Sequence, residues 1–230
     1  ALNEWGFDVV AFDQFGHGDS PGKRGTLTTS TRLLDDLAAV VDQVREGMPG
    51  GQPLILLGHS MGGALAARFV AENRRPVDGL VLSSPALASG MKAWQRALAG
   101  VLEKIAPDFT IANGLPINAI SRDPAEVAAY RADPLVHDRV SGRLARFVDA
   151  SGAPVLAAAS TWQVPTLLLF SGSDRLVDAE GSRRFAALAP QDRVTAQEFP
   201  RHFHELFNDV ERASVFDALQ RWLDQRFPGR

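Results

Sequence analysis

Ser60 stands in a sequence context that could make it a nucleophile. It lies within Gly58-His59-Ser60-Met61-Gly62-Gly63, which follows an apolar run and opens a stretch of small residues. A G-x-S-x-G pattern between a strand and a helix is typical of a nucleophile elbow, a sharp turn that holds the serine in a strained backbone conformation. Gly58 and Gly62 would let strand and helix approach closely. The Met61 N–H, at the helix start, could then face a developing oxyanion.

A nucleophilic serine needs a base, and the base needs an acid that orients it. Asp174 lies three residues after the end of the apolar run of residues 165–171 and is the favoured acid. Asp178 is the alternative, but it lies a further turn along and suits the start of a helix, where acidic groups are stabilised.

Histidine follows the run of residues 194–199, as His202 or His204. Residues two apart point the same way in extended chain, so the spacing leaves both open as the base. Because the carboxyl ends of parallel strands share one edge of a sheet, Ser60, Asp174 and this histidine would meet there. The chain order of serine, aspartate and histidine is that of α/β-hydrolases.

Apolar runs with strand character alternate with longer helical patterns. These elements must position Ser60, Asp174 and the histidine. The runs are residues 7–12, 53–58, 79–83, 165–171 and 194–199. The middle three are nearly continuously apolar, as strands covered on both faces are. Apolar residues recur at helical spacing over residues 33–44, after Ser60, and over residues 210–227. This alternation predicts an α/β fold with a mostly parallel sheet and helices on both faces.

Residues 86–163 interrupt the alternation. A loop of that length without structure of its own is uncommon inside a compact domain. We therefore predict an inserted, largely helical unit at 86–163, with residues 1–85 and 164–230 forming the core domain. Its first helix carries an apolar stripe that suits either packing between helices or contact with an acyl chain. The stripe consists of Met91, Trp94, Leu98, Val101, Leu102 and Ile105.

Composition excludes several classes of protein. The 230 residues are 45% hydrophobic and 22% charged, and the net charge is −3 without an extended basic run, so a nucleic-acid partner is not expected. The absence of cysteine excludes a disulfide framework and thiolate metal sites. The longest uncharged stretches are broken by proline and glycine, so neither predicts a membrane span. We expect no metal, no organic cofactor and a cytoplasmic location.

Several motifs resemble one family, the monoacylglycerol lipase and lysophospholipase branch of the serine α/β-hydrolases, which is grouped with serine aminopeptidase S33. Residues 58–63 resemble its G-H-S-M-G-G elbow and Gly172-Ser173-Asp174 its acid turn. Asp13-Gln14-Phe15-Gly16-His17-Gly18-Asp19-Ser20-Pro21-Gly22 resembles its D-x-x-G-H-G-x-S-x-G loop, and His204-Glu205-Leu206-Phe207-Asn208 resembles its H-E-L-x-N segment. The resemblance implies an α/β-hydrolase fold in which His204 is the catalytic histidine.

The insertion also resembles that family. Residues 121–124 and 130–137 are similar to its cap pattern, and the cap in these enzymes covers an acyl-binding tunnel. We interpret His17 as packing the loop after the first strand and His59 as a structural neighbour of the nucleophile. His137 is interpreted as a cap residue near the junction with the sheet, with contact to ligand as the alternative.

The beginning of the chain departs from the family pattern. Family members carry an earlier strand and an H-G-x-G-like loop that donates the second oxyanion N–H. In the family that strand lies between those corresponding to residues 7–12 and 53–58. The resemblance therefore predicts that the N-terminal strand and the second donor lie outside these 230 residues.

Together these observations predict a serine esterase for monoacylglycerol-like or lysophospholipid-like esters. Ser60 would attack the ester, His204 would move the proton, Asp174 would orient His204, and Met61 would serve the oxyanion hole. The partner is a small acyl ester, with at most peripheral membrane contact through the cap. Two alternatives stay open: another acyl substrate, such as a small ester, thioester or peptide, or a ligand-binding protein without turnover.

Overall fold

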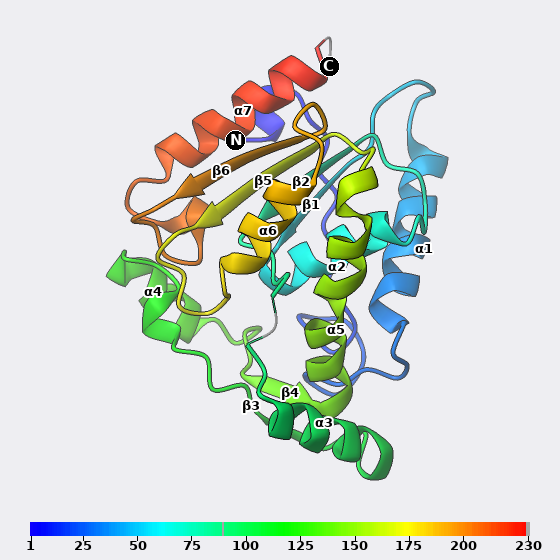
Figure 1. Cartoon of the computed structure of the whole chain (residues 1–230), viewed down its shortest axis with the longest axis vertical. Coiled ribbons are helices and arrows are strands. Elements are labelled where there is room, and N and C mark those ends of the chain that lie inside the picture. The colour runs from blue at the N-terminus through cyan, green and yellow to red at the C-terminus, as the bar shows by residue number, and fades with distance from the viewer. Residues whose placement is uncertain (89, 229–230) are drawn as a thin grey trace.

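Four parallel strands form the main sheet, in the order β1-β2-β5-β6 (Figure 1). The computed structural model describes residues 1–88 and 90–228. The strands are β1 (Ile55–His59), β2 (Gly79–Ser83), β5 (Thr166–Ser171) and β6 (Val194–Phe199). These are four of the five strands that the apolar runs predict, at bounds that differ by two residues at most.

The two central strands are buried on both faces, as their continuous apolar sequence predicts. Every residue of β2 and β5 is buried, whereas β6 at one edge is exposed at three of its six residues. Successive side chains point to opposite faces of the sheet. Leu80 and Leu82 accordingly pack on one side, while Val81 packs on the other.

The fifth predicted strand, residues 7–12, is wrong. The segment has no strand structure, and Val9 and Val10 are exposed. A strand needs a hydrogen-bonded neighbour, and no strand of the described residues pairs with this segment. On that side the sheet ends at β1, where Leu57 is exposed as well. The apolar run favours a strand, but whether a partner strand lies beside it does not follow from the run itself.

Helices cover both faces of the sheet (Figure 1). The C-terminal helix α7 (Ala213–Arg226) packs on one face through Val215, Leu219 and Trp222. The other face carries α2 (Ser60–Ala71) and α6 (Glu180–Leu188), with α1 (Arg32–Gly47) packed outside α2. Of these helices, α1, α2 and α7 match the apolar stripes that predict them.

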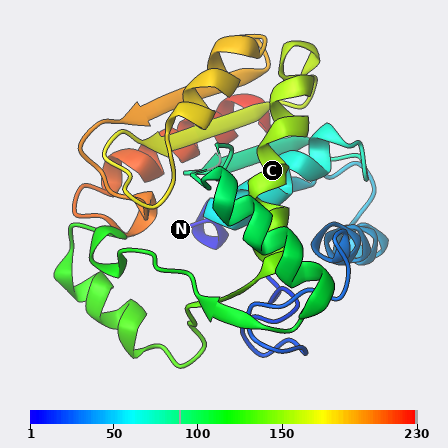
Figure 2. The ribbon, with the colours of Figure 1, turned by 60° about the horizontal axis from the view of Figure 1, so that its bottom comes forward.

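Residues 86–88 and 90–163, the described part of the predicted insertion, contain three α-helices, two short 3-10 helices and a pair of short antiparallel strands. The α-helices and strands are α3 (Ala93–Ile105), β3 (Thr110–Ala112), α4 (Pro124–Ala132), β4 (Arg139–Ser141) and α5 (Gly142–Ala158). Both α3 and α4 lie on the side to which the arrows of β5 and β6 point (Figures 1 and 2). By contrast, α5 contributes Leu144, Phe147 and Val155 to the core clusters beneath the sheet. The last helix of the insertion is thus packed as part of the core.

Replacing Leu168 by Ala would remove a fully buried side chain from β5. We expect the free energy of unfolding to fall by about 2–5 kcal/mol, measured by urea denaturation. Leu188→Ala is the matched control, because the same atoms are removed from an exposed position on α6. That control should change stability by no more than about 0.5 kcal/mol. Equal losses in the two variants would contradict the core described above.

Candidate active site

Ser60 is the first residue of α2 and follows the last residue of β1 directly. Its φ of 54° lies in the left-handed region, which residues other than glycine rarely adopt. A residue held there stores strain that the surrounding structure must support. The predicted sharp turn between strand and helix is present, and it places Ser60 at the carboxyl edge of the sheet.

Two glycines give this turn its space. A Cβ on Gly58 would collide with the backbone carbonyl of Gly62, and a Cβ on Gly63 would come within 2.9 Å of the Pro85 Cβ. A Cβ on Gly62 would meet only the Gln14 Nε2, at 3.8 Å. The prediction that Gly62 supplies the space is therefore wrong, and Gly63 does so instead. The reason is that Gly63, one position further along α2, faces the chain that leaves β2.

Met61 is the second residue of α2. Backbone N–H groups in the first turn of a helix have no acceptor within that helix, and the helix dipole favours negative charge beside them. The Met61 N–H is therefore available to an anion at the position that the sequence predicts.

Asp174 and His204 are brought together. The His204 Nδ1 lies 2.7 Å from the Asp174 Oδ2, and the two side chains are only 4% and 2% exposed. The other carboxylate oxygen of Asp174 accepts hydrogen bonds from the backbone N–H groups of Leu176 and Val177, at 2.8 and 2.9 Å. Burial pushes the pKa of Asp174 up, but the bond and charge of His204 and these N–H groups outweigh burial and leave the pKa below its usual range. Asp174 is thus a carboxylate that orients His204.

The two alternative residues have other contacts. His202 is buried and packs its ring against Phe199, with a centroid distance of 5.0 Å. Asp178 accepts a hydrogen bond from the Glu180 N–H at the start of α6, which is the helix-start role that the sequence predicts. Neither residue takes part in the Asp174–His204 pair.

The segment that follows β2 is bound to both Ser60 and His204. The Ala86 N–H donates to the Ser60 carbonyl at 3.1 Å, and the Ser84 hydroxyl donates to the His204 carbonyl at 2.9 Å. Beside them, the rings of His59 and His204 have centroids 4.6 Å apart. His204 therefore lies next to the residue that precedes Ser60.

Residues 120–122 of the insertion bind the loop that carries His204. The Glu205 N–H donates to the Ile120 carbonyl at 2.7 Å, and the Ser121 hydroxyl donates to the Asn208 carbonyl at 2.7 Å. Arg122 donates through Nε to the buried Asp209 carboxylate at 2.9 Å. We call residues 120–122 the strap.

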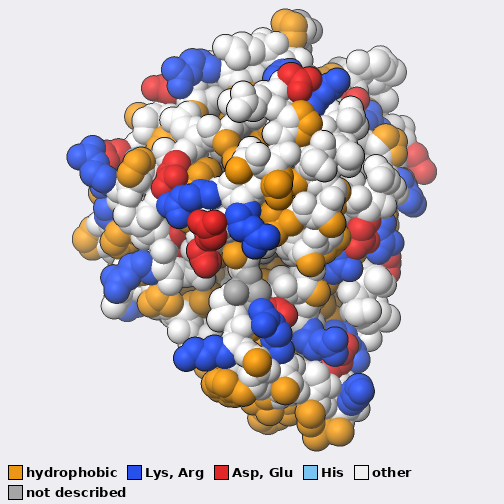
Figure 3. All heavy atoms as spheres, viewed as in Figure 1, with side chains coloured by type: hydrophobic (Ala, Val, Ile, Leu, Met, Phe, Trp, Pro, Cys, Tyr) orange, Lys and Arg blue, Asp and Glu red, His pale blue; other side chains and the backbone are white. Residues whose placement is uncertain are grey.

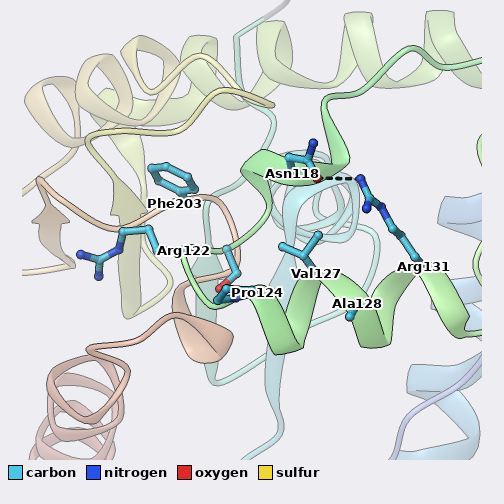
Figure 4. A pocket seen from close by; sticks show the side chains of 8 residues that line it. Asn118, Arg122, Pro124, Val127, Ala128, Arg131 and Phe203 are labelled. Carbon is cyan, nitrogen blue, oxygen red and sulfur yellow. Dashed lines mark hydrogen bonds between the residues drawn. The ribbon is translucent and has the colours of Figure 1, made fainter.

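An open hollow of about 470 Å³ lies beside the strap, between α4 and Phe203 (Figure 4). Within it the Arg131 guanidinium donates to the Asn118 side chain at 2.6 Å. The strap residues Ser121 and Arg122 also line this hollow, so it lies against the segment that holds the His204 loop.

His17 and His137 stack against each other, with ring centroids 4.7 Å apart. The His137 Nε2 lies 3.1 Å from the Gly16 carbonyl. Burial, and then the neighbouring His17, hold the pKa of His137 below its usual range. These contacts join the loop at residues 13–22 to the insertion, and they are structural, as interpreted from the sequence.

Sequence reasoning missed Glu205. Its Oε1 lies 3.1 Å from the His59 Nε2, and its side chain is 24% exposed. The sequence feature that could have indicated Glu205 is its position directly after His204. A carboxylate in a loop is usually solvated, so the sequence alone did not single it out.

The chain is similar to known proteins over most of its length. Residues 1–211 match the model of the family described as serine aminopeptidase, S33. The chain belongs to this family. Among its relatives, a monoacylglycerol lipase of Mycolicibacterium smegmatis is 34% identical over 221 residues, covering 95% of this chain and 78% of that protein. A phospholipase of Bacillus subtilis is 32% identical over 228 residues, covering 96% of this chain and 85% of that protein.

A solved structure agrees with this assignment to the S33 family. The crystal structure of the monoacylglycerol lipase from Paleococcus ferrophilus has a TM-score of 0.87 and 36% identity, covering 98% of this chain and 86% of that chain. The predicted resemblance and the α/β-hydrolase fold are confirmed.

Within residues 1–88 and 90–228, no three His, Cys, Asp or Glu side chains cluster as metal ligands would. None of the helices in those ranges is long and apolar enough to cross a membrane. The expectations of no cofactor and of a cytoplasmic location stay predictions.

The two glycines of the elbow can be separated by substitution. We expect Gly58→Ala to lower the free energy of unfolding by about 1–3 kcal/mol, because its Cβ would displace helix backbone. Gly62→Ala should be neutral or stabilise by up to about 1 kcal/mol, because alanine favours the helix more than glycine. Thermal denaturation of both variants checks this. A larger loss for Gly62→Ala than for Gly58→Ala would contradict the packing of the turn.

Proposed function

We propose that this chain is a serine carboxylesterase that hydrolyses lipid esters of the monoacylglycerol or lysophospholipid type. The buried Asp174–His204 pair beside the strained Ser60 turn is the observation that carries the proposal. The names of the relatives from M. smegmatis and B. subtilis support the substrate class.

The geometry suits an acyl-enzyme mechanism. Asp174 holds the His204 Nδ1, which leaves the Nε2 as the basic nitrogen for the Ser60 hydroxyl. Ser60 attacks the ester carbonyl as His204 takes its proton, and His204 then protonates the leaving alcohol. The Met61 N–H stabilises the oxyanion. Water, activated by His204, releases the acid from Ser60.

The insertion supplies a surface for lipid. On α3 the apolar stripe faces outward rather than into the core: Trp94, Leu98, Val101 and Ile105 are all exposed and follow one helical face. Phe109, Ile111 and Leu115 extend this apolar surface beyond the helix, and apolar side chains gather at the same end of the molecule in Figure 3. Lys92 and Lys104 flank the stripe. An exposed apolar stripe with basic neighbours suits peripheral contact with a lipid surface.

The serine mechanism is tested with a fluorophosphonate and intact-mass measurement. We expect one covalent adduct on the unmodified protein and none on Ser60→Ala, with ester hydrolysis lowered at least about a thousandfold in that variant. Thermal denaturation of Ser60→Ala confirms that it is folded. A folded protein without adduct or turnover would favour the ligand-binding alternative, and turnover retained by Ser60→Ala would refute the proposal.

The apolar surface is tested with a long-chain monoacylglycerol presented in vesicles. Trp94→Ser with Ile105→Ser removes two apolar side chains from the proposed lipid contact, and we expect about a tenfold lower rate on vesicles. Hydrolysis of a water-soluble short-chain ester should be unchanged. Leu188→Ser, which changes another exposed apolar side chain, on α6, is the control and should affect neither rate. A preference for acetyl esters or amino-acid amides would contradict the lipid substrate class.

A further inference from the structure

A second histidine lies against His204, and a second carboxylate lies against that histidine. His59 ends β1, and its ring packs on that of His204 with an interplanar angle of 53°. On its far side the His59 Nδ1 lies 3.2 Å from the hydroxyl of Ser83, which pairs with His59 in the sheet. The end of the sheet therefore fixes the position of the His59 ring.

Glu205 completes this arrangement. Its Oε1 lies 3.1 Å from the His59 Nε2, although the two atoms are not aligned as a hydrogen bond. Its backbone N–H is bound to the strap, and the Asn208 side chain donates to its Oε2 at 3.3 Å. Glu205 is thus held in place from both sides.

The charge state of Glu205 follows from its neighbours. Burial pushes its pKa up, but His59 and His204 outweigh burial and leave the pKa below its usual range. From the insertion, Tyr130 on α4 faces this carboxylate, and its pKa is raised by burial and then by the charge of Glu205. A neutral phenol does not offset the charge. At neutral pH, the packed rings of His59 and His204 therefore lie between two carboxylates, with Glu205 at His59 and Asp174 at His204.

We propose that His59 and Glu205 are a positioning pair for His204, with His59 fixing its ring and Glu205 stabilising its protonated form. The proposal rests on the proposed function, in which His204 becomes an imidazolium during each proton transfer. Neither residue is required to touch the substrate, so both act through His204.

The negative charge of Glu205 should act on the protonated form of His204 in one direction only. A nearby negative charge favours the protonated imidazole and raises its pKa. Neutralising Glu205 should therefore make the imidazolium of His204 harder to form. The acidic limb of the kcat/KM profile, which reports the free enzyme, should then move to lower pH, and kcat should fall more than KM rises.

The decisive measurement is a titration of the ring proton signals of the five histidines by NMR. It is made in the Ser60→Ala protein and does not need turnover. Adding Glu205→Gln should move the midpoint of the His204 signal to lower pH. Glu205→Asp keeps the charge and should restore most of the shift. Glu211→Gln is the control, because Glu211 pairs with Arg122 and Arg201 rather than with a histidine.

Kinetics with a soluble short-chain ester give the second test. Glu205→Gln should lower kcat about three- to tenfold and move the acidic limb of the kcat/KM profile to lower pH. His59→Gln should also lower kcat, and the double variant should lose less than the product of the two single effects, because one pair is broken in each case.

The outcomes separate this inference from the proposed function. The positioning pair would be overturned if Glu205→Gln left the His204 titration unchanged. It would also be overturned if the variant only lost stability and fluorophosphonate-reactive protein while the acidic limb of its kcat/KM profile stayed in place. No adduct on the unmodified protein would instead overturn the proposed function. Even if no adduct formed, a His204 titration that moved to lower pH on Glu205→Gln would still support the pair.

Discussion

The register between parallel strands decides where every reactive group lies. Ser171 at the end of β5 pairs with Phe199 at the end of β6, so the two loops that follow begin side by side. Three residues beyond Ser171 the chain reaches Asp174, and five beyond Phe199 it reaches His204, and the two side chains bond at 2.7 Å. At the other end of the sheet, His59 pairs with Ser83, and Ser60 follows at once. A slip of one residue in any pair would turn these side chains to the opposite face.

Most of this arrangement could be predicted because it depends on local patterns. Continuous apolar runs predict β2 and β5, and the glycine-flanked serine predicts the turn before α2. The histidine was different, because the spacing left His202 and His204 equal, and only the resemblance of residues 204–208 to a family motif separated them. Their environments differ through contacts with Phe199 and Asp174, which lie elsewhere in the chain.

The features that sequence could not predict are those that depend on a neighbour distant in the chain. Residues 7–12 have the composition of a strand but lack a paired partner among the described residues. Gly63, rather than Gly62, faces Pro85, because the direction in which the chain leaves β2 is a tertiary property. Glu205 becomes significant only when β1 brings His59 beside it. The apolar stripe on α3 has helical spacing whether it faces a core or the solvent, so its exposure could not be predicted either.

The strap has a consequence for how such proteins can be recombined. The Asp209 carboxylate has no exposed surface, and it accepts bonds from Arg122 and from the N–H groups of Phe203 and Val210. An exchange of residues 86–163 with another insertion that lacks a cation at position 122 would leave that charge buried and unpaired, at a cost of about 3–5 kcal/mol. The insertion is therefore not an interchangeable module. It contributes Arg122, which binds Asp209 in the loop that carries His204. A chimaera must therefore contain both Arg122 and Asp209.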